Sequence, residues 1–214
     1  TEVRVVAPSD GGEVGAPELD GVPARRVRYG TPAEETLAYR GTMAEAGRSL
    51  GGALRALAMG RALRRAVREE LSAGAELVHA HWWIPGGMAA PPEAPLVVTC
   101  HGTDVALLRN SAAARALAQP VFRRARVVTT VSAALAEVVE RTTGRMVDPA
   151  HRQPMPAATE RYGRWSEGGT GWIVVARLTR QKRIDLVLDA VALLRREGHT
   201  MPLTLVGDGP ERGA

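Results

Sequence analysis

Short runs of apolar residues recur along the chain, and most of them do not alternate with polar positions. Runs of this kind, rich in β-branched residues, are typical of strands that are covered on both faces of a sheet. Segments with helical spacing lie between most of them, so the pattern predicts strand–helix–strand units with right-handed crossovers and a parallel sheet. The predicted strands are residues 3–8, 77–83, 96–100, 127–132, 172–176 and 203–207.

Residues 47–72 have the spacing of a helix, but their apolar side chains form two separate faces. The two faces are offset around the helix axis, and the change falls at Gly60. We therefore expect a bend or two helices at that point. The side chains concerned are Leu50, Leu54 and Leu57 on one face, and Leu63, Val67 and Leu71 on the other.

Two further helices have recognisable ends. Ser132 is suited to cap a helix over residues 133–141, and Gly144 fits its end. Residues 184–194 place apolar side chains at i, i+3, i+4, i+7 and i+10, which predicts a helix with one apolar face. Arg195 and Arg196 fall in its last turn and Gly198 comes shortly after it, as is usual at helix ends.

A tract rich in Pro and Gly, residues 148–171, separates two parts of different composition. It predicts an N-terminal domain over residues 1–147, a linker over 148–171 and a second domain over 172–214. The strand, helix and strand of the last part are too few to close a sheet of their own. We therefore expect a longer protein, with residues absent at both ends. We also expect residues 88–98 to leave little room for a crossover helix.

Composition narrows the class of protein. Of 214 residues, 45% are hydrophobic but only 4% are aromatic, so the core is expected to be aliphatic. No apolar run approaches the ~18 residues of a membrane span. Cys100 is the only cysteine, which excludes an internal disulfide framework and fits a reducing compartment. We expect a cytoplasmic protein, and leave open a peripheral contact with the inner face of the membrane. The oligomeric state is not readable.

The chain is basic, with a net charge of +5, and its cations are densest over residues 61–70. A basic face is able to meet nucleic acid, an anionic membrane or a phosphorylated substrate, although a solvated helix face is the simpler interpretation. No zinc-finger spacing, aromatic RNA-binding signature or helix-turn-helix pattern accompanies it. Nucleic acid is therefore not an expected partner.

Lys182 is the only lysine among the 28 Lys and Arg residues, and it ends the loop between a predicted strand and a predicted helix. Ligands of open α/β sheets bind beyond the carboxyl ends of strands, where a helix N-terminus also attracts anions. Arg offers a planar two-pronged contact, whereas Lys is a compact, movable charge. Arg177 and Lys182 together predict a diphosphate site; an accidental surface lysine is the alternative.

Several motifs carry a family resemblance. RLTRQKRIDLVLDAVALL (residues 177–194) and LTLVGDGPER (203–212) resemble the donor half of the retaining glycosyltransferases of family 4, which have the GT-B fold. LVHAHWWIPGG (77–87) and VVTCHGTDV (97–105) are similar to the acceptor-half motifs, and PMPAATERY (154–162) occupies the interdomain crossing. The resemblance implies an α/β protein with two Rossmann-like doubly wound parallel-sheet domains facing a cleft, the second only partly present.

The resemblance also implies an activity: transfer of a hexosyl group from a UDP- or GDP-sugar to a hydroxyl of a sugar, aminocyclitol or lipid, with retention of configuration. It places Arg177 and Lys182 on the donor diphosphate and His101 at the donor sugar. No D-x-D metal clamp occurs, so no metal or other cofactor is expected. The two cations and the helix dipole would then neutralise the leaving diphosphate.

The HGTD segment also has an interpretation from its residues alone. His101 follows a buried strand, so it lies on the rim where ligands bind. An imidazole there donates to a hydroxyl or phosphate oxygen, or shifts a proton; a hydrogen bond within the loop is the alternative. Gly102 lets the backbone come close to a ligand. Thr103 and Asp104 either hold this loop or meet acceptor hydroxyls.

His79 and His81 alternate on one strand and point to the same face, with His81 nearer the carboxyl end. His81 either lines the acceptor cleft or is a satisfied core histidine. Trp82 and Trp83 are able to stack on a sugar, although packing is the preferred interpretation.

Gly207, Asp208 and Gly209 follow the last predicted strand. They are expected to approach the nucleotide part of the donor, and a plain tight turn is the alternative.

Three departures from the family pattern leave rival interpretations open. The Gly-rich N-terminal strand and loop and the E-x7-E donor element are missing, and Pro156, Ala157 and Ala158 stand where Gly-Val-Asp is common. We expect the 214 residues alone to be inactive. The rivals are a sugar-nucleotide 2-epimerase of the same architecture, a degenerate binding module, and a basic nucleic-acid-binding protein. A P-loop, a G-x-G-x-x-G run, a G-x-S-x-G elbow and paired hydrolase carboxylates are all lacking.

Overall fold

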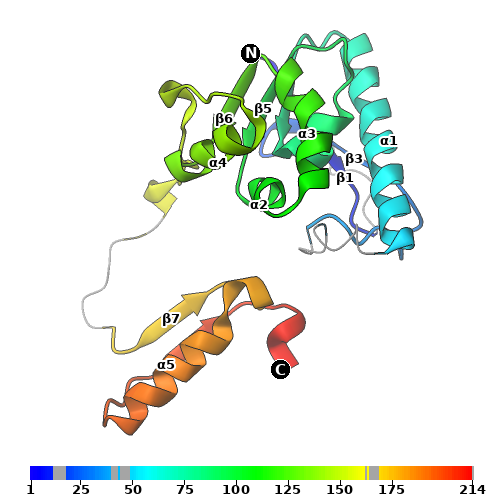
Figure 1. The fold of residues 1–214 in the computed structure, drawn as a ribbon. Helices are drawn as coiled ribbons and strands as arrows, with labels where there is room; N and C mark the ends of the chain where they lie inside the picture. Colours follow the sequence, from blue (N-terminus) through cyan, green and yellow to red (C-terminus); the bar gives the residue numbers. More distant parts are fainter. Residues whose placement is uncertain (12–17, 40–42, 44–48, 162, 164–168, 214) are drawn as a thin grey trace. The chain divides into compact units, whose positions relative to one another are not determined.

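The computed structural model describes residues 1–11, 18–39, 43, 49–161, 163 and 169–213. The chain forms two compact units, Thr1–Pro156 and Ala157–Ala214 (Figure 1). The division falls within the tract that the sequence marks as a linker. The start of that tract nevertheless belongs to the first unit, because the Gln153 N–H donates to the Thr130 carbonyl at 2.8 Å and the Arg152 guanidinium lies 3.6 Å from Glu140.

The centre of the first unit is a parallel sheet of three strands, β4 (Val78–His81), β5 (Leu96–Cys100) and β6 (Val127–Thr130). Three helices pack against one another and against one face of it: α2 (Thr103–Asn110), α3 (Ala112–Arg124) and α4 (Ala133–Thr143) (Figure 1). The core between them is aliphatic apart from Trp83 and Phe122, as the composition predicts. The parallel α/β architecture predicted from the sequence is therefore confirmed.

Burial in this sheet alternates along each strand. Leu96, Val98 and Cys100 are buried on β5, whereas Val97 and Thr99 are only half-buried. On β4 the two histidines are exposed and Ala80 between them is buried. The expectation of strands covered on both faces was therefore wrong for these strands. The open face is the one that carries the polar side chains.

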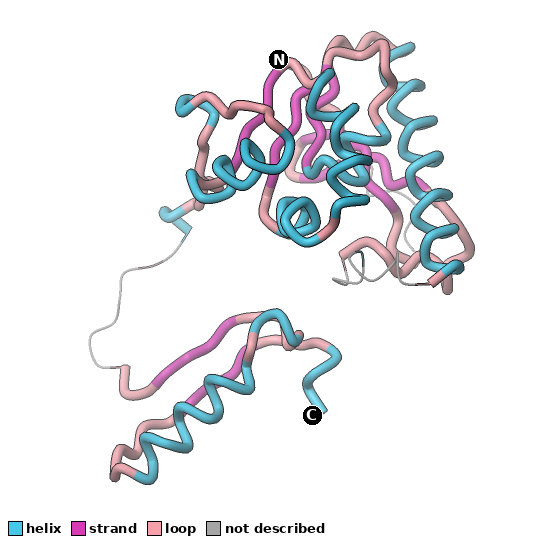
Figure 2. The backbone as a smooth tube through the Cα atoms, viewed as in Figure 1, coloured by secondary structure: helices cyan, strands magenta, loops and turns pink. Residues whose placement is uncertain are grey.

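A second sheet of the first unit was missed by the sequence pattern in part. β1 (Val5–Pro8) pairs in parallel with β3 (Val22–Val27), which pairs antiparallel with β2 (Glu18–Leu19). β3 has the sequence VPARRV, and its proline and two arginines conceal the strand pattern. The long helix α1 (Leu50–Ser72) lies along this sheet (Figure 2).

Helix α1 is continuous, so the predicted bend at Gly60 was wrong. Its core-facing positions are Gly52, Met59, Leu63 and Ala66, which lie on one stripe at helical spacing. The first leucine face points to solvent instead, with Leu50, Leu54 and Leu57 exposed to 80%, 59% and 52%. Residues 47 and 48 of the predicted helix lie outside the described residues. One buried stripe does not require an axis change.

The connection from β4 to β5 is short, as expected, and holds the wide helical turn η2 (Trp82–Gly87) in place of a full helix. Arg124 at the end of α3 fixes this connection. Its guanidinium donates to the carbonyls of Gly87, Ala90 and Pro91 at 3.0, 2.8 and 2.9 Å.

The predicted helix caps are confirmed. The Ser132 hydroxyl accepts from the Leu135 N–H at 3.3 Å, and Gly144 ends α4 with a φ of 71°. In the second unit, α5 (Ile184–Arg196) has Arg195 and Arg196 in its last turn, and Gly198 follows with a φ of 90°.

The second unit contains the parallel pair β7 (Trp172–Val175) and β8 (Leu203–Val206), with α5 between them in sequence. Its short 3-10 helices are η4 (Thr159–Arg161), η5 (Arg180–Lys182) and η6 (Pro210–Gly213). As expected of a strand, a helix and a strand that are too few to close a sheet, apolar side chains of this unit stay open to solvent: Leu188 is 50% and Leu205 is 39% exposed. None of the helices in the described parts of the chain combines the length and apolarity needed to cross a bilayer.

Candidate functional site

Two loops at the carboxyl ends of β7 and β8 are bonded to each other. The Leu178 N–H donates to the Asp208 carbonyl at 2.9 Å, and the Glu211 N–H donates to the Leu178 carbonyl at 3.1 Å. A Cβ added at Gly207 or Gly209 would overlap the carbonyl oxygen of Ala176 or Leu178. Glycine is required at both positions for this contact, which brings the residue 177–182 loop beside the Gly207–Gly209 loop.

The two predicted donor-binding cations lie at either end of the first of these loops, and both are exposed. η5 forms its second half, where the Lys182 N–H donates to the Thr179 carbonyl at 2.9 Å. Arg183 follows in the left-handed conformation, with a φ of 49°, and helix α5 begins at Ile184. Lys182 is thereby held directly before the start of a helix, where unpaired amides and the helix dipole favour an anion.

Neighbouring cations are already engaged. Arg180 lies 3.6 Å from Glu211. Arg183 donates to Asp185 at 2.9 Å, and this side-chain hydrogen bond holds the pKa of Asp185 below its ordinary value. Lys182 forms no ion pair with any carboxylate in the described part of the chain. Its charge is therefore the one most directly offered to a ligand. Asp208 accepts from the Gly209 N–H at 2.8 Å and lies 3.6 Å from Arg212.

The second set of predicted residues lies in the first unit, at the carboxyl ends of β4 and β5. Asp104 organises it. This carboxylate is fully buried, and its Oδ1 accepts from the backbone N–H groups of His101 and Gly102, both at 3.0 Å. Gly102 has a φ of 127°, and Thr103 starts α2 half-buried. The structure therefore supports the loop-holding interpretation of Asp104, whose buried side chain acts through His101.

His81 and His101 are joined across the two strand ends. His81 Nδ1 lies 2.8 Å from His101 Nε2, and the rings are tilted by 33°. His79 stacks on His81 with the ring centroids 4.6 Å apart, and its Nε2 lies 2.7 Å from the Thr99 hydroxyl. Partial burial, followed by the neighbouring imidazoles, lowers the pKa of both His79 and His81. This edge of the sheet thus favours neutral imidazoles.

The two tryptophans after β4 differ in environment. Trp83 is fully buried, and its Nε1–H donates to the Asp104 carbonyl at 2.7 Å, so the packing interpretation is confirmed for it. Trp82 is half-buried and has a φ of 72°, an uncommon conformation for a residue with a side chain. Of the two tryptophans, Trp82 therefore keeps part of its side chain exposed next to His81.

The site residues come together in two groups. His81, Trp82, His101, Gly102, Thr103 and Asp104 form one group in the first unit; Arg177, Lys182, Gly207, Asp208 and Gly209 form the other in the second unit. Glu35 and Arg124, which organise loops of the first unit, were not anticipated, because the role of each depends on contacts far along the sequence. Among the described residues no group of three or more His, Cys, Asp or Glu side chains is arranged to hold a metal ion.

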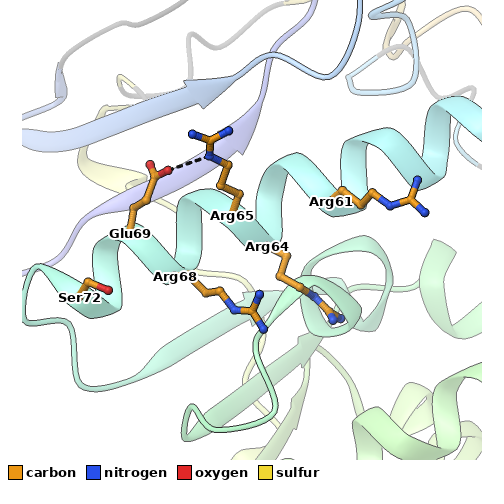
Figure 3. A pocket seen from close by; sticks show the side chains of 6 residues that line it. All are labelled: Arg61, Arg64, Arg65, Arg68, Glu69 and Ser72. Carbon is orange, nitrogen blue, oxygen red and sulfur yellow. Dashed lines mark hydrogen bonds and ion pairs between the residues drawn. The ribbon is translucent and has the colours of Figure 1, made fainter.

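A widely open hollow of about 520 Å³ lies along α1, and its lining residues belong to neither group. Figure 3 shows arginines projecting to both sides of the helix around it. Most of them are tied to neighbours: Arg65 donates to Glu69 at 3.0 Å, Arg68 lies 3.5 Å from Glu93, and Arg64 donates to the Met88 carbonyl. These contacts favour a solvated, ion-paired helix face over an anion site.

Comparison with known proteins agrees with the fold and with the motifs of the first unit. The family model described as Glycosyltransferase Family 4 matches residues 1–161. The matched segment includes β4, β5 and the HGTD loop, and so the whole first group of site residues. No curated protein matches the chain. Since the family model covers most of its length, the chain belongs to glycosyltransferase family 4.

Proposed function

We propose that the protein transfers a hexosyl group from a UDP- or GDP-sugar to an acceptor hydroxyl, with retention of configuration. The observation that carries the proposal is the pair of loops in the second unit. They set Arg177 and Lys182 around a helix start and hold Gly207 and Gly209 against the same backbone. Such an arrangement suits a diphosphate, because cations and helix amides both stabilise negative charge.

In this proposal each group of residues has one task. Arg177 and Lys182 bind the diphosphate and stabilise the charge that develops on it as the sugar departs. Gly207, Asp208 and Gly209 lie against the nucleotide. The transfer needs no metal, because the two cations and the start of α5 neutralise the leaving group.

The residues of the first unit serve the sugar. His101 contacts the donor sugar, while His81, Trp82, Gly102 and Thr103 line the acceptor side. Asp104 holds the loop through its bonds to His101 and Gly102. The acceptor is a sugar, an aminocyclitol or a lipid, the last of which would place the cytoplasmic enzyme at the inner face of the membrane.

A 2-epimerase would need acid and base carboxylates at the sugar. The one carboxylate that the structure describes beside His101 is Asp104, and its Oδ1 is occupied by two backbone N–H groups. Transfer is therefore favoured over epimerisation. Transfer does not need such a carboxylic acid, because the leaving diphosphate requires cations.

A donor screen by thermal shift tests the proposal. UDP, GDP and their sugars should raise the melting temperature. At a hundredfold excess over Kd, the bound ligand adds about 2.7 kcal/mol to the free energy of unfolding. Arg177→Ala and Lys182→Ala should each weaken this effect. In the intact, active enzyme each should also cost roughly 2–4 kcal/mol of transition-state stabilisation. A chelator should change nothing.

Arg180→Ala is the matched control, since this side chain is 92% exposed in the same loop and pairs with Glu211. It should leave nucleotide binding within about twofold of wild type, as expected for an exposed ion pair. Full binding and turnover in the Arg177 and Lys182 variants would refute the proposed donor site.

A further inference from the structure

The contact between His81 and His101 restricts the protons that the two rings hold. With 2.8 Å between His81 Nδ1 and His101 Nε2, one hydrogen lies between the two nitrogens, because neither is able to accept without the other donating. If His81 donates, the neutral His101 carries its own hydrogen on Nδ1. If His101 donates, its Nδ1 is a bare acceptor. The direction of this one bond therefore decides whether His101 offers a donor or an acceptor at its outer nitrogen.

The surroundings hold the His81 ring in place. His79 stacks on it and is itself held by the Thr99 hydroxyl at 2.7 Å, which in turn lies 2.5 Å from the Thr129 hydroxyl. These contacts connect side chains of β4, β5 and β6. His81 joins them to His101. These are exposed or half-buried positions on the open face of the sheet.

We propose that His81 and His101 act as one proton-sharing pair, in which His81 fixes the ring nitrogen that His101 presents to the sugar. His81 is then a positioning residue, and His101 the group in contact with the ligand. The identity of that ligand rests on the proposed glycosyl transfer, whereas the pairing itself rests on the geometry of the two rings.

A shared hydrogen also limits the charge of the pair. One added proton is accommodated, since an imidazolium still donates to a neutral imidazole. A second added proton would place two N–H groups against each other and break the bond. In the described part of the first unit, the titratable groups next to the pair are His79 on β4 and Asp104 at the start of α2, and β5 and β6 contribute the hydroxyls of Thr99 and Thr129. The pair should therefore take up its two protons in two separate steps.

NMR titration of the imidazole nitrogens tests the pairing without any substrate. In the wild-type chain, both His81 and His101 should respond in two shared steps separated by more than about one pH unit. His101 should show one neutral tautomer. His151 and His199 serve as internal references, because in the described part of the chain neither ring lies against another imidazole.

Two substitutions separate proton sharing from simple packing. In His81→Asn an amide replaces the ring nitrogen: His101 should keep one dominant tautomer but titrate in a single step. In His81→Ala both properties should be lost, so His101 becomes a mixture of tautomers. Unchanged His101 titration in His81→Asn would overturn the proposal, whether or not the alanine variant folds. Nucleotide binding through Lys182 is measured separately, so failure of the pairing would leave the proposed donor site intact.

Discussion

Glu35 shows how one buried side chain joins distant parts of the first unit. Its side chain has no exposure, yet its carboxylate accepts from the Ser9 hydroxyl at 2.8 Å and from the Tyr29 N–H at 2.9 Å. Arg28 lies 3.5 Å away. Burial by itself would raise the pKa of Glu35, but the hydrogen bonds and the Arg28 charge outweigh it and hold the pKa below 4.5. The ionised carboxylate therefore ties the ends of β1 and β3 together.

Glu35→Leu should destabilise the first unit by about 3–5 kcal/mol, because Ser9, Tyr29 and Arg28 lose a buried partner. The folded-state pKa of Glu35 is lowered, so its contribution is present above the ordinary value of 4.5 and is lost as the pH falls through the folded value. The difference between wild type and variant should shrink accordingly in acid. Hydrogen exchange of the β3 and α1 amides reports on this unit alone.

Glu34→Leu is the neighbouring control. Glu34 is exposed, and its carboxylate accepts from the N–H and hydroxyl of the neighbouring Thr31. Its loss should cost less than about 1 kcal/mol. An equal loss of stability in the two variants would mean that the buried contacts of Glu35 add nothing beyond those of an exposed glutamate.

At the scale of elements, local signals were predictable and long-range ones were not. Ser132, Gly144 and Gly198 act within a few residues of their own position, so the ends of α4 and α5 follow from the sequence. The face of α1 does not, because a leucine stripe and a Met–Leu–Ala stripe are equally regular, and only the partners decide which is buried. β3 pairs with β1 although the two strands are not adjacent in the sequence, and its two arginines hide that pairing.

The same reasoning applies to the candidate site. The glycines of the Gly207–Gly209 loop and the position of Lys182 before α5 could be anticipated, because each follows directly from a strand end. The bond between His81 and His101 could not, because it depends on the register of β4 against β5, which pairs His81 with Thr99. Asp104 likewise had two equal interpretations until its partners were known.

Arg124 is the clearest case of an element held by a distant side chain. Arg124→Ala should lower stability by about 2–3 kcal/mol, because three carbonyls of the β4–β5 connection lose a charged donor. Partial burial lowers the pKa of this guanidinium, without bringing its loss of charge within reach of ordinary pH. Thermal and urea denaturation would measure the change.

Arg123→Ala supplies the comparison within one helix turn, since Arg123 is exposed. A substitution there is expected to stay within about 0.5 kcal/mol of wild type. Because the connection carries Trp82 beside His81, Arg124→Ala should also alter the fluorescence of the folded state, which Arg123→Ala should not. Similar behaviour of the two variants would contradict the bracing role of Arg124.

At the scale of the whole molecule, the roles of the two units rest on different observations. The family match lies over the first unit and ends at residue 161, just after the division at residue 156. The proposed donor role of the second unit rests on its loops, its single lysine and the motif resemblance. An experiment on the whole chain should therefore measure, for each unit separately, which part of the donor protects it.

Hydrogen exchange with two ligands asks that question. A nucleoside diphosphate alone should slow exchange in residues 177–183 and 207–212, by up to ~100-fold at a hundredfold excess over Kd, because in the proposed binding mode the phosphates and nucleotide contact these loops. A nucleotide sugar should protect the same loops and extend protection to residues 101–104, where His101 is proposed to contact the sugar. Protection of residues 101–104 by the diphosphate alone, or of neither loop by either ligand, would contradict this division of the donor between the two units.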